Sequence, residues 1–373
     1  MTSLGRPIDA GIVGAAIVLP AVFGALAGGV VIDRIGPRRT SVVADLLSGI
    51  AVAAVPLAAL TVGLSLPLVV VLAFLGALLD APGQTARQVL LPDLAAAGGI
   101  RLERANAIFQ AVDNASLLIG PAIAGIIVLV LGPLGALWLD TGSFLVSAVL
   151  IRLLVPDIRP SEVDDAPADI TAGLRALGRD RVLRLLTVVA AIANLVGTPL
   201  FIVVLPALAT GSGQSAAALG AMLAAFGGGM VVGALGLGLL ADRVSRRAVL
   251  VFGFAGTGLG LVAASAVEPL PLLVVVLGLA GLATGTINPI AFTVMQERVP
   301  AATRGRVFGA VLGLVLVAAP VGMLVLGSVA DVQGPRTALL VSGVTFVLIG
   351  GLVAFRAESR ELDLPGPAAA SSG

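Results

Sequence analysis

The sequence predicts an all-α protein that crosses a membrane many times, and two observations support this fold class. Of its 373 residues, 58% are hydrophobic and 12% are charged, whereas a soluble domain carries about 25% charged residues. A water-soluble chain of this size could not hide so much apolar surface, because its own exterior would be apolar too. The apolar residues also form long continuous runs, unlike the alternating segments of about ten residues typical of a transmembrane β-barrel.

Eleven of these runs are long enough to cross about 30 Å of hydrocarbon, which takes roughly 20 helical residues. Five runs precede an acidic segment near the middle of the chain, at about 10–32, 40–62, 67–90, 105–130 and 133–155. Six follow it, at about 182–209, 215–241, 247–267, 270–296, 306–330 and 336–356. The sequence therefore predicts two helical bundles of five and six spans.

The segments between these runs alternate between charged and nearly uncharged ones. By our count, 20 of the 22 arginines lie in the charged segments or at the adjoining helix ends, and Arg6 and Arg336 are the exceptions. Because arginine-rich loops stay in the cytoplasm, we expect a multi-pass protein of the plasma or inner membrane. Its charged loops, its linker and its C-terminus would then be cytoplasmic.

The chain divides into four parts, namely an N-terminal bundle (1–155), a cytoplasmic linker (156–181), a C-terminal bundle (182–356) and a disordered cytoplasmic tail (357–373). The linker opens with PDIRPSEVDDAPAD, which is polar, acidic and proline-bearing like an inter-domain connection. Four arginines then follow at spacings that indicate an amphipathic helix, at Arg175, Arg179, Arg181 and Arg184.

The residue types that are absent exclude several kinds of site. The chain has no Cys and no His, which excludes disulfides, the usual zinc sites and histidine acid–base chemistry. All 22 basic residues are Arg, so no Schiff-base or P-loop lysine exists. A net charge of +1 does not indicate a surface that binds nucleic acid, because such a surface needs an excess of positive charge. We therefore expect no enzyme, no cofactor, no metal and no nucleic-acid partner. The chain is expected to be a monomer in membrane lipid.

One charged phrase occurs twice. GGVVIDRIGPRRT (28–40) contains Asp33, and LLADRVSRRAVL (239–250) contains Asp242, 209 residues later. Each phrase closes one apolar run and opens the next. A parallel repeat of this length, hinged at an acidic linker, is typical of a transporter built from two similar bundles.

The first phrase resembles the loop motif of the major facilitator superfamily, Gly-x-x-x-Asp-Arg-x-Gly-x-Arg-Arg. The residues that fill it here are Gly29, Asp33, Arg34, Gly36, Arg38 and Arg39. The second phrase lacks the internal glycine and fills the equivalent position with Asp242, Arg243, Arg246 and Arg247. The resemblance covers nearly the whole chain and implies the major facilitator fold, in which two pseudo-symmetric bundles transport a small molecule by alternating access.

Further stretches resemble the drug- and siderophore-exporting branch, which includes enterobactin and macrolide exporters. APGQTARQVLLPDL (81–94) and VMQERVPAATRGRVFGAV (294–311) are typical of it. A partial match to the fifth-helix signature of antiporters is formed by Gly120, Pro121 and Gly125, with Ala124 in place of a glycine. The resemblance implies proton-coupled export of a hydrophobic or amphiphilic compound, and an importer or facilitator of a small organic solute is the alternative.

The resemblance also implies that the first family helix is missing, because the motif follows the first apolar run and not the second. Two explanations are open. The true start lies upstream of Met1, which we favour, or the chain is a truncated remnant that does not transport.

The resemblance further implies that the two charged phrases form a conformational latch between the bundles. A carboxylate suits a helix N-terminus, which carries about half a positive charge. Asp33 would contact the helix that follows Arg304, and Asp242 the helix that starts near Ala105. The alternative is that these loops only set membrane orientation, which explains their arginines but not Asp33.

Two acids lie deep in apolar runs, and we expect them to couple transport to protons. Charges at such depth usually face a cavity or a partner, and these two are Asp80 and Asp113. The alternatives are an ion pair with Arg87 for Asp80 and a backbone hydrogen bond for Asp113. Asp45 is expected to pair with the cytoplasmic arginines, and Asp140 to lie near the outer surface.

Four polar side chains are candidates for lining a substrate cavity, namely Asn114, Asn194, Asn288 and Gln296. Simple hydrogen bonds between helices are the alternative for the last three. Pro289 frees a backbone carbonyl and is expected to bend its helix. Aromatic residues such as Phe201 and Phe292 are expected mainly to face lipid, and stacking against an aromatic ligand is the alternative. Four Gly-x-x-x-Gly pairs are expected to be packing faces, at Gly24/Gly28, Gly229/Gly233, Gly281/Gly285 and Gly309/Gly313.

Overall fold

The computed structural model describes residues 7–61, 63, 66–156, 170–211, 216–241 and 243–364, and every regular element within them is a helix. The first part of the chain forms α1 (Pro7–Ile35), α2 (Pro37–Thr61), α3 (Leu66–Ala97) and α4 (Leu102–Leu154). After α5 (Ile170–Arg179) come α6 (Arg181–Pro199), η1 (Leu200–Val204), α7 (Leu205–Gly211), α8 (Ala216–Leu240), α9 (Arg246–Ala266), α10 (Leu270–Gly285), α11 (Ile287–Arg298), η2 (Ala301–Thr303), α12 (Arg304–Gln333), α13 (Pro335–Phe355) and η3 (Ala357–Asp363).

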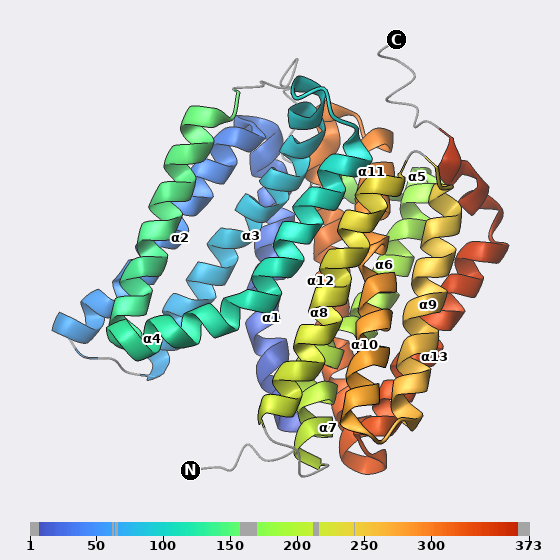
Figure 1. Ribbon diagram of the computed structural model, residues 1–373. Coiled ribbons are helices and arrows are strands. Elements are labelled where there is room, and N and C mark those ends of the chain that lie inside the picture. The colour runs from blue at the N-terminus through green and yellow to red at the C-terminus, as the bar shows by residue number, and fades with distance from the viewer. Residues whose placement is uncertain are drawn as a thin grey trace.

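The helices form two bundles that lie side by side (Figure 1). In the first bundle α2 packs against α3 and α4, and α1 packs against α3. In the second bundle α9 packs against α13, α8 against α10, and α6 against α12. The bundles meet mainly along α1 with α12 and α4 with α8, and α4 also contacts α11 and α3 contacts α12. Any movement of one bundle against the other must therefore change these contacts.

Two glycines allow the sharp turns of the first bundle. Gly36 has φ 88° and Gly132 has φ 71°, in the left-handed region that residues with a side chain rarely adopt. Gly36 separates α1 from α2 by a single residue, and Gly132 divides α4 into two runs. These runs correspond to the predicted spans 105–130 and 133–155. The second run returns beside α2, as Figure 1 shows at its left edge.

Prolines account for the interruptions in the second bundle. Thr286 separates α10 from α11, within the single apolar run predicted over 270–296. Pro289 lacks the N–H that would bond to the carbonyl of Gly285 one turn earlier, so the helix ladder breaks there. The helix is thus interrupted at Thr286, three residues before the proline at which a bend was predicted. Likewise, the π-helical turn η1 lies between Pro199 and Pro206.

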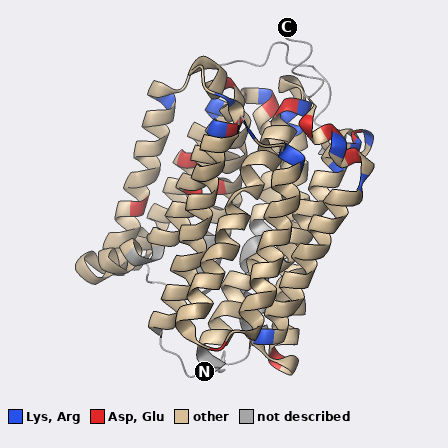
Figure 2. Ribbon diagram, turned by 45° about the vertical axis from the view of Figure 1, so that its right-hand side comes forward, with Lys and Arg blue, Asp and Glu red and all other residues tan. Residues whose placement is uncertain are grey.

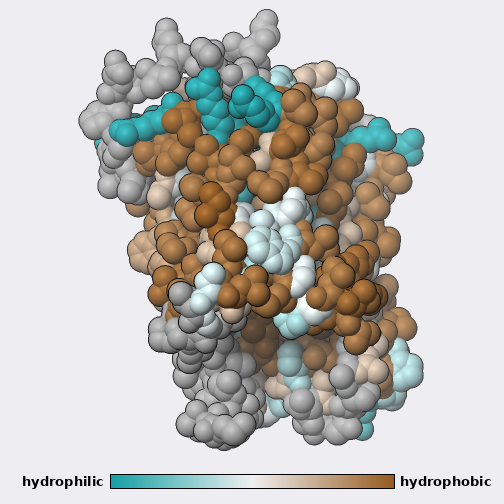
Figure 3. All heavy atoms as spheres, turned by 90° about the vertical axis from the view of Figure 1, so that its left-hand side faces the viewer, coloured by the Kyte–Doolittle hydropathy of each residue, from teal (hydrophilic) through white to brown (hydrophobic). Residues whose placement is uncertain are grey.

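The outside of the molecule is apolar over most of its length. Figure 3 shows an apolar belt with hydrophilic residues gathered at one end, and Figure 2 shows most of the charged residues at that same end. We call it the charged end. In the part of the chain that the structure describes, eight helical segments are long and apolar enough to span a membrane. The prediction of eleven spans is a count over the whole chain.

The predicted disordered tail differs from the structure in its first part. Residues 357–363 form the 3₁₀ helix η3, in which Ser359 and Leu362 are fully buried. The carboxylate of Asp363 accepts hydrogen bonds from Ser245 Oγ (2.8 Å) and from the Arg247 backbone (3.3 Å). These contacts hold the segment against the start of α9, although its composition is polar. Residues 365–373 lie outside the described part of the chain.

Glycines permit the closest helix contacts, as the four Gly-x-x-x-Gly pairs predicted. Gly229 and Gly233 on α8 lie directly against the backbone of α10 at Gly278 and Leu282, and a Cβ at either glycine would overlap a carbonyl oxygen there. Small residues of this kind let membrane helices approach closely. The prediction that these pairs are packing faces is confirmed.

Gly233→Ala is expected to destabilise the protein, because its new methyl group would overlap the Leu282 carbonyl oxygen. Overpacking of this kind costs about 1–3 kcal/mol. Gly236→Ala on the same helix is the matched control, since nothing lies within 4 Å of a Cβ there. Thermal unfolding of the purified variants should show a lower midpoint for Gly233→Ala alone. Equal midpoints would contradict this account of the α8–α10 contact.

Candidate functional site

The Asp33 carboxylate connects the two bundles at the charged end. It accepts hydrogen bonds from the backbone N–H of Gly305 (2.8 Å) and of Arg306 (3.1 Å) and from Arg306 Nε (2.7 Å). Gly305 and Arg306 are in the first turn of α12, where backbone N–H groups lack helix partners and attract negative charge. Asp33 therefore both caps α12 and forms an ion pair with it, across the boundary between the bundles.

The glycines of the motif allow this contact to form. Gly29 lies one turn before Asp33, and a Cβ at Gly29 would come within 2.5 Å of the Gly305 carbonyl oxygen. Gly36 provides the turn that ends α1. Arg34 and Arg39 are exposed, while Arg38 donates a hydrogen bond to the carbonyl of Arg152 at the end of α4. The arginines thus lie at the charged end but outside the Asp33 contact.

The second charged phrase makes a different connection in the structure. Asp242, its predicted acid, lies outside the described residues, and Arg243 is exposed. Arg246 at the start of α9 forms ion pairs with Glu103 of α4 (2.6 Å) and with Glu297 of α11 (2.7 Å). Arg247 donates to the carbonyl of Ala354 within its own bundle. Arg246 is therefore the member of this phrase that the structure places between the bundles.

The ion pair with Arg246 also changes the acidity of Glu103. Burial alone would raise the pKa of this carboxyl, but hydrogen bonds from Arg246 and Arg101 outweigh burial and lower the pKa below its ordinary value. Glu103 is therefore ionised whenever a free glutamate would be. The contact it makes persists at neutral pH.

A buried polar cluster lies beside these ion pairs. Asn106 Nδ2 of α4 donates to Gln296 Oε1 (2.6 Å) and to Thr293 Oγ1 (3.0 Å) of α11. Gln296 Nε2 in turn donates to the carbonyl of Gln88 on α3 (2.9 Å). Gln296 lies in this contact between the bundles and not in the cavity, because its amide bonds to two buried groups there, the Asn106 amide and the Gln88 carbonyl. A hydrogen bond between helices was the alternative considered for it.

The other members of this cluster were not predicted from the sequence. Asn106 and Glu103 are both buried and lie three residues apart, hence on one face of α4. Two polar residues with this spacing, next to a charged segment, are the signal that could have marked them. Arg304 and Asp93 add a further pair between α12 and α3 at 3.8 Å. Together these contacts close the charged end between the bundles.

The acids of the first bundle surround Arg87 of α3. Arg87 Nη1 binds Asp45 Oδ1 of α2 at 3.0 Å, and Arg87 Nη2 lies 3.7 Å from Asp80 Oδ1. Asp45 also accepts a hydrogen bond from Ser147 (2.6 Å). The partner of Asp45 is thus Arg87 and not the arginines of the loop, because Asp45 lies two helical turns beyond them on α2.

The two predicted coupling acids have different surroundings. Asp80 takes part in the ion pair with Arg87 and accepts a hydrogen bond from Gln84 (2.6 Å), which is the alternative considered for it. Asp113 of α4 is exposed, and Arg87 is the positive charge that acts on it. Asp140 is exposed and close to Ser143. Asp80 and Asp113 therefore belong to one group of charges centred on Arg87.

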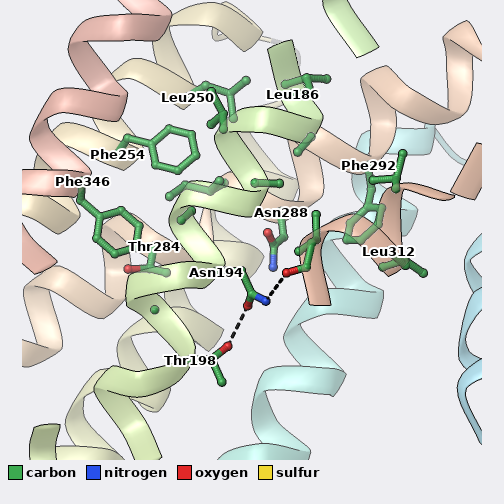
Figure 4. Close-up of a pocket in the computed structure, with 18 of the residues that line it drawn as sticks. Leu186, Asn194, Thr198, Leu250, Phe254, Thr284, Asn288, Phe292, Leu312 and Phe346 are labelled. Carbon is green, nitrogen blue, oxygen red and sulfur yellow. Dashed lines mark hydrogen bonds between the residues drawn. The ribbon is translucent and has the colours of Figure 1, made fainter. Parts of the chain in front are cut away.

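A cavity of about 510 Å³ opens inside the second bundle. It lies between α6, η1, α9, α10, α11, α12 and α13, and Leu117 of α4 is the one lining residue from the first bundle. Its polar lining residues are Asn194, Thr198, Thr284 and Asn288, and none of its lining residues is charged. Figure 4 shows leucine and phenylalanine side chains around the amides of Asn194 and Asn288. The cavity can hold an uncharged or weakly polar molecule that offers a few hydrogen-bonding groups.

Two of the four predicted cavity residues line this space. Asn194 Nδ2 donates to the Val315 carbonyl and Asn194 Oδ1 accepts from Thr198, each at 2.7 Å, as Figure 4 shows. Asn288 is exposed to the cavity and makes no hydrogen bond to any described residue. Asn114 is buried and does not line it.

The aromatic lining was only partly anticipated. Phe201 and Phe292 line the cavity, although both were expected mainly to face lipid, and Phe254 and Phe346 complete the set. The rings of Phe254 and Phe346 stack with centroids 6.2 Å apart. No local pattern marks these two residues, because they come from α9 and α13 and meet only when those helices pack.

The antiporter-like motif lies on α4. Gly120 and Gly125 have open space where a Cβ would be, since no heavy atom lies within 4 Å. Their small size is therefore not required by packing in this conformation. The side chain of Pro121 lies outside the described residues.

The sequence profile of the Major Facilitator Superfamily matches the chain over residues 1–201 and 187–371. The multidrug efflux pump Tap of Mycolicibacterium fortuitum is 35% identical over 96% of this chain and 90% of its own length. Tap of Mycobacterium tuberculosis is 36% identical over 96% of this chain and 88% of its own length. The enterobactin exporter EntS of Shigella flexneri is 27% identical over 88% of this chain and 78% of its own length.

Solved structures share the fold at lower identity. The human organic anion transporter MFSD10 superposes with a TM-score of 0.75 at 20% identity, over 92% of this chain and 83% of its own. The E. coli fucose:proton symporter FucP superposes with a TM-score of 0.71 at 17% identity, over 94% and 92%. The paired bundles, the Asp33 contact and these matches agree, and the chain belongs to the major facilitator superfamily, as a multi-pass transporter of the cell membrane and not an enzyme.

Proposed function

We propose that this protein exports small hydrophobic or amphiphilic compounds across the cell membrane by alternating access, as a monomer and in exchange for protons. The observation that carries the proposal is the uncharged cavity of about 510 Å³ beside a charged end that is closed between the bundles. An apolar pocket with a few polar groups is what such compounds require. The relatives named multidrug efflux pump and enterobactin exporter support the direction of transport.

The proposal places the charged end in the cytoplasm, following the excess of arginine in its loops. The conformation described here would then be closed to the cytoplasm. Its latch is the Asp33 contact with α12, together with the pair of Arg246 and Glu103. Opening the cytoplasmic side requires both to break, so the two contacts would set the balance between the two states.

Proton coupling would use the charge group around Arg87. Asp113 is the acid of this group that makes no hydrogen bond or ion pair to a described residue, so it is free to exchange a proton. A proton on Asp113 removes its attraction to Arg87 and leaves that arginine to Asp45 and Asp80. The exchange of partners around one arginine is the step we assign to coupling.

Efflux of lipophilic dyes from cells that make the full chain tests the function. Export should lower dye accumulation, and a protonophore should restore it. Asp113→Asn should abolish uphill export but retain dye exchange at equal concentrations on both sides, because binding does not need the proton. Asp331→Asn, at the end opposite the charged end, is the control. Unchanged uphill export by Asp113→Asn would refute the coupling role, and dye uptake in place of export would refute the direction.

Asp33→Asn should shift the protein toward the state open at the charged end. A carboxylate at a helix N-terminus contributes about 0.3–2 kcal/mol, so the equilibrium should change about two- to thirtyfold. The chain has no cysteine, so a single cysteine in place of Ala107, fully buried between α4 and α8, can report opening through its labelling rate. Labelling should be faster in Asp33→Asn and unchanged in Glu268→Gln. An unchanged rate in both would show that Asp33 is no latch.

Asn288→Ala should weaken substrate binding and leave the fold intact, because the amide has no partner among the described residues. Loss of one hydrogen bond costs about 0.5–1.5 kcal/mol, so the KM of an exported dye should rise about two- to tenfold with little change in maximal rate. Gln333→Ala, at the far end of α12, is the matched control. A fall in maximal rate at constant KM would exclude Asn288 from the binding site.

A further inference from the structure

A second, smaller cavity lies on the outside of the second bundle at the charged end. Its volume is about 160 Å³, and it is formed where the start of α6 meets the end of α13 and the beginning of η3. Its lining residues are Arg181, Arg184, Leu185, Val188, Leu352, Arg356 and Glu358. It is separate from the cavity of about 510 Å³, because the two have no lining residue in common.

Positive charge dominates this outer cavity. Three arginines and one glutamate line it, which leaves a net charge of +2. Arg184 donates to the carbonyl of Gly178 (3.1 Å). The side chains of Arg181 and Arg356 form no ion pair or hydrogen bond with any described residue. Guanidinium groups are matched in shape and charge to phosphate oxygens, so an anion of that chemistry fits the site.

The remaining lining residues are apolar and extend the cavity along the outer face of the bundle. Val188 is 47% exposed and lies on α6 beyond the two arginines, and Leu352 lies one turn before Arg356 on α13. Phe355, which directly precedes Arg356, is 93% exposed. In a membrane this face would contact acyl chains, since exposed apolar side chains adjoin the arginines here. Charge and apolar surface thus adjoin at the height where lipid headgroups begin.

Contacts within the protein hold the elements that surround this cavity in place. Its lining includes Glu358 at the start of η3. The buried side chain of Leu362 and the hydrogen bonds of Asp363 to Ser245 and Arg247 hold η3 in place. Glu361 adds an ion pair with Arg298 (3.2 Å), which also binds Asp180 at the N-terminus of α6 (3.1 Å). Both walls of the cavity are therefore tied to the same set of charges, which fixes the start of α6 relative to η3.

We infer that this cavity binds the phosphate of an anionic phospholipid from the leaflet at the charged end. Arg181 and Arg184 would bind the headgroup phosphate together with Arg356, and one acyl chain would lie along Val188 and Leu352. Two positive charges in excess and an adjoining apolar face favour a lipid over a free anion, which would use only the charges. The inference does not depend on which compound the protein transports.

Native mass spectrometry of the purified full chain tests this site with phosphatidylglycerol and phosphatidylcholine of identical acyl chains. Phosphatidylglycerol should bind more tightly. Arg181→Gln combined with Arg184→Gln should weaken its binding about twenty-fivefold, since each basic residue near a membrane surface contributes about fivefold. Arg104→Gln combined with Arg360→Gln removes the same charge from exposed positions at the same end and should have little effect.

Three results would overturn the inference. Equal binding of both lipids would exclude recognition of anionic lipid, and equal losses in the two double variants would indicate diffuse surface charge. Competition by inorganic phosphate at the same concentration as lipid would assign the cavity to free anions. Thermal unfolding in detergent would verify that both double variants fold. Arg356→Gln, on the opposite wall, provides an independent variant and should weaken phosphatidylglycerol binding about fivefold.

Discussion

The contact between the Asp33 carboxylate and the first turn of α12 is the interaction on which the arrangement of the two bundles depends. It satisfies two backbone N–H groups that no helix carbonyl can reach and pairs with Arg306 as well. In a chain whose surroundings are lipid, unpaired groups of this kind are costly. One carboxylate therefore stabilises a helix start and a boundary between bundles at once, and losing it affects both.

The polar groups of the protein are concentrated where the bundles meet and where they end. Asn106 donates to Gln296 and to Thr293 across the boundary, and Arg246 joins Glu103 to Glu297 nearby. The long apolar helices provide no comparable specificity, because lipid and neighbouring helices are equally apolar. Close packing through glycine holds α8 to α10 and also α1 to α12, where Gly29 meets Gly305. Between the bundles, hydrogen bonds and ion pairs are a second kind of contact. The second kind of contact can break and re-form, which a transporter requires.

The lining of the cavity likewise contains two kinds of polar group, those bonded within the protein and those open to a ligand. Its walls are mainly aliphatic and aromatic, and Asn194 is tied to Val315 and Thr198 while Asn288 has no such bond among the described residues. One amide thus shapes the wall, and the other is available to a ligand. The charges that could respond to protons lie in the first bundle around Arg87. The proposed substrate and proton sites therefore belong to different bundles, and movement between the bundles would couple them.

The sequence by itself determined the helices, the interruption near Pro289, the glycine packing faces and the family, because each depends on local composition, spacing or one short motif. The contact of Asp33 with the helix after Arg304 could be anticipated from the motif and from the attraction of a carboxylate to a helix start. Only the tertiary structure decided that Asp45 pairs with Arg87, that Gln296 lies between the bundles, and that Phe254 meets Phe346. These pairings depend on how each helix is rotated about its axis and on where distant helices cross, and in a uniformly apolar chain the sequence does not encode that rotation.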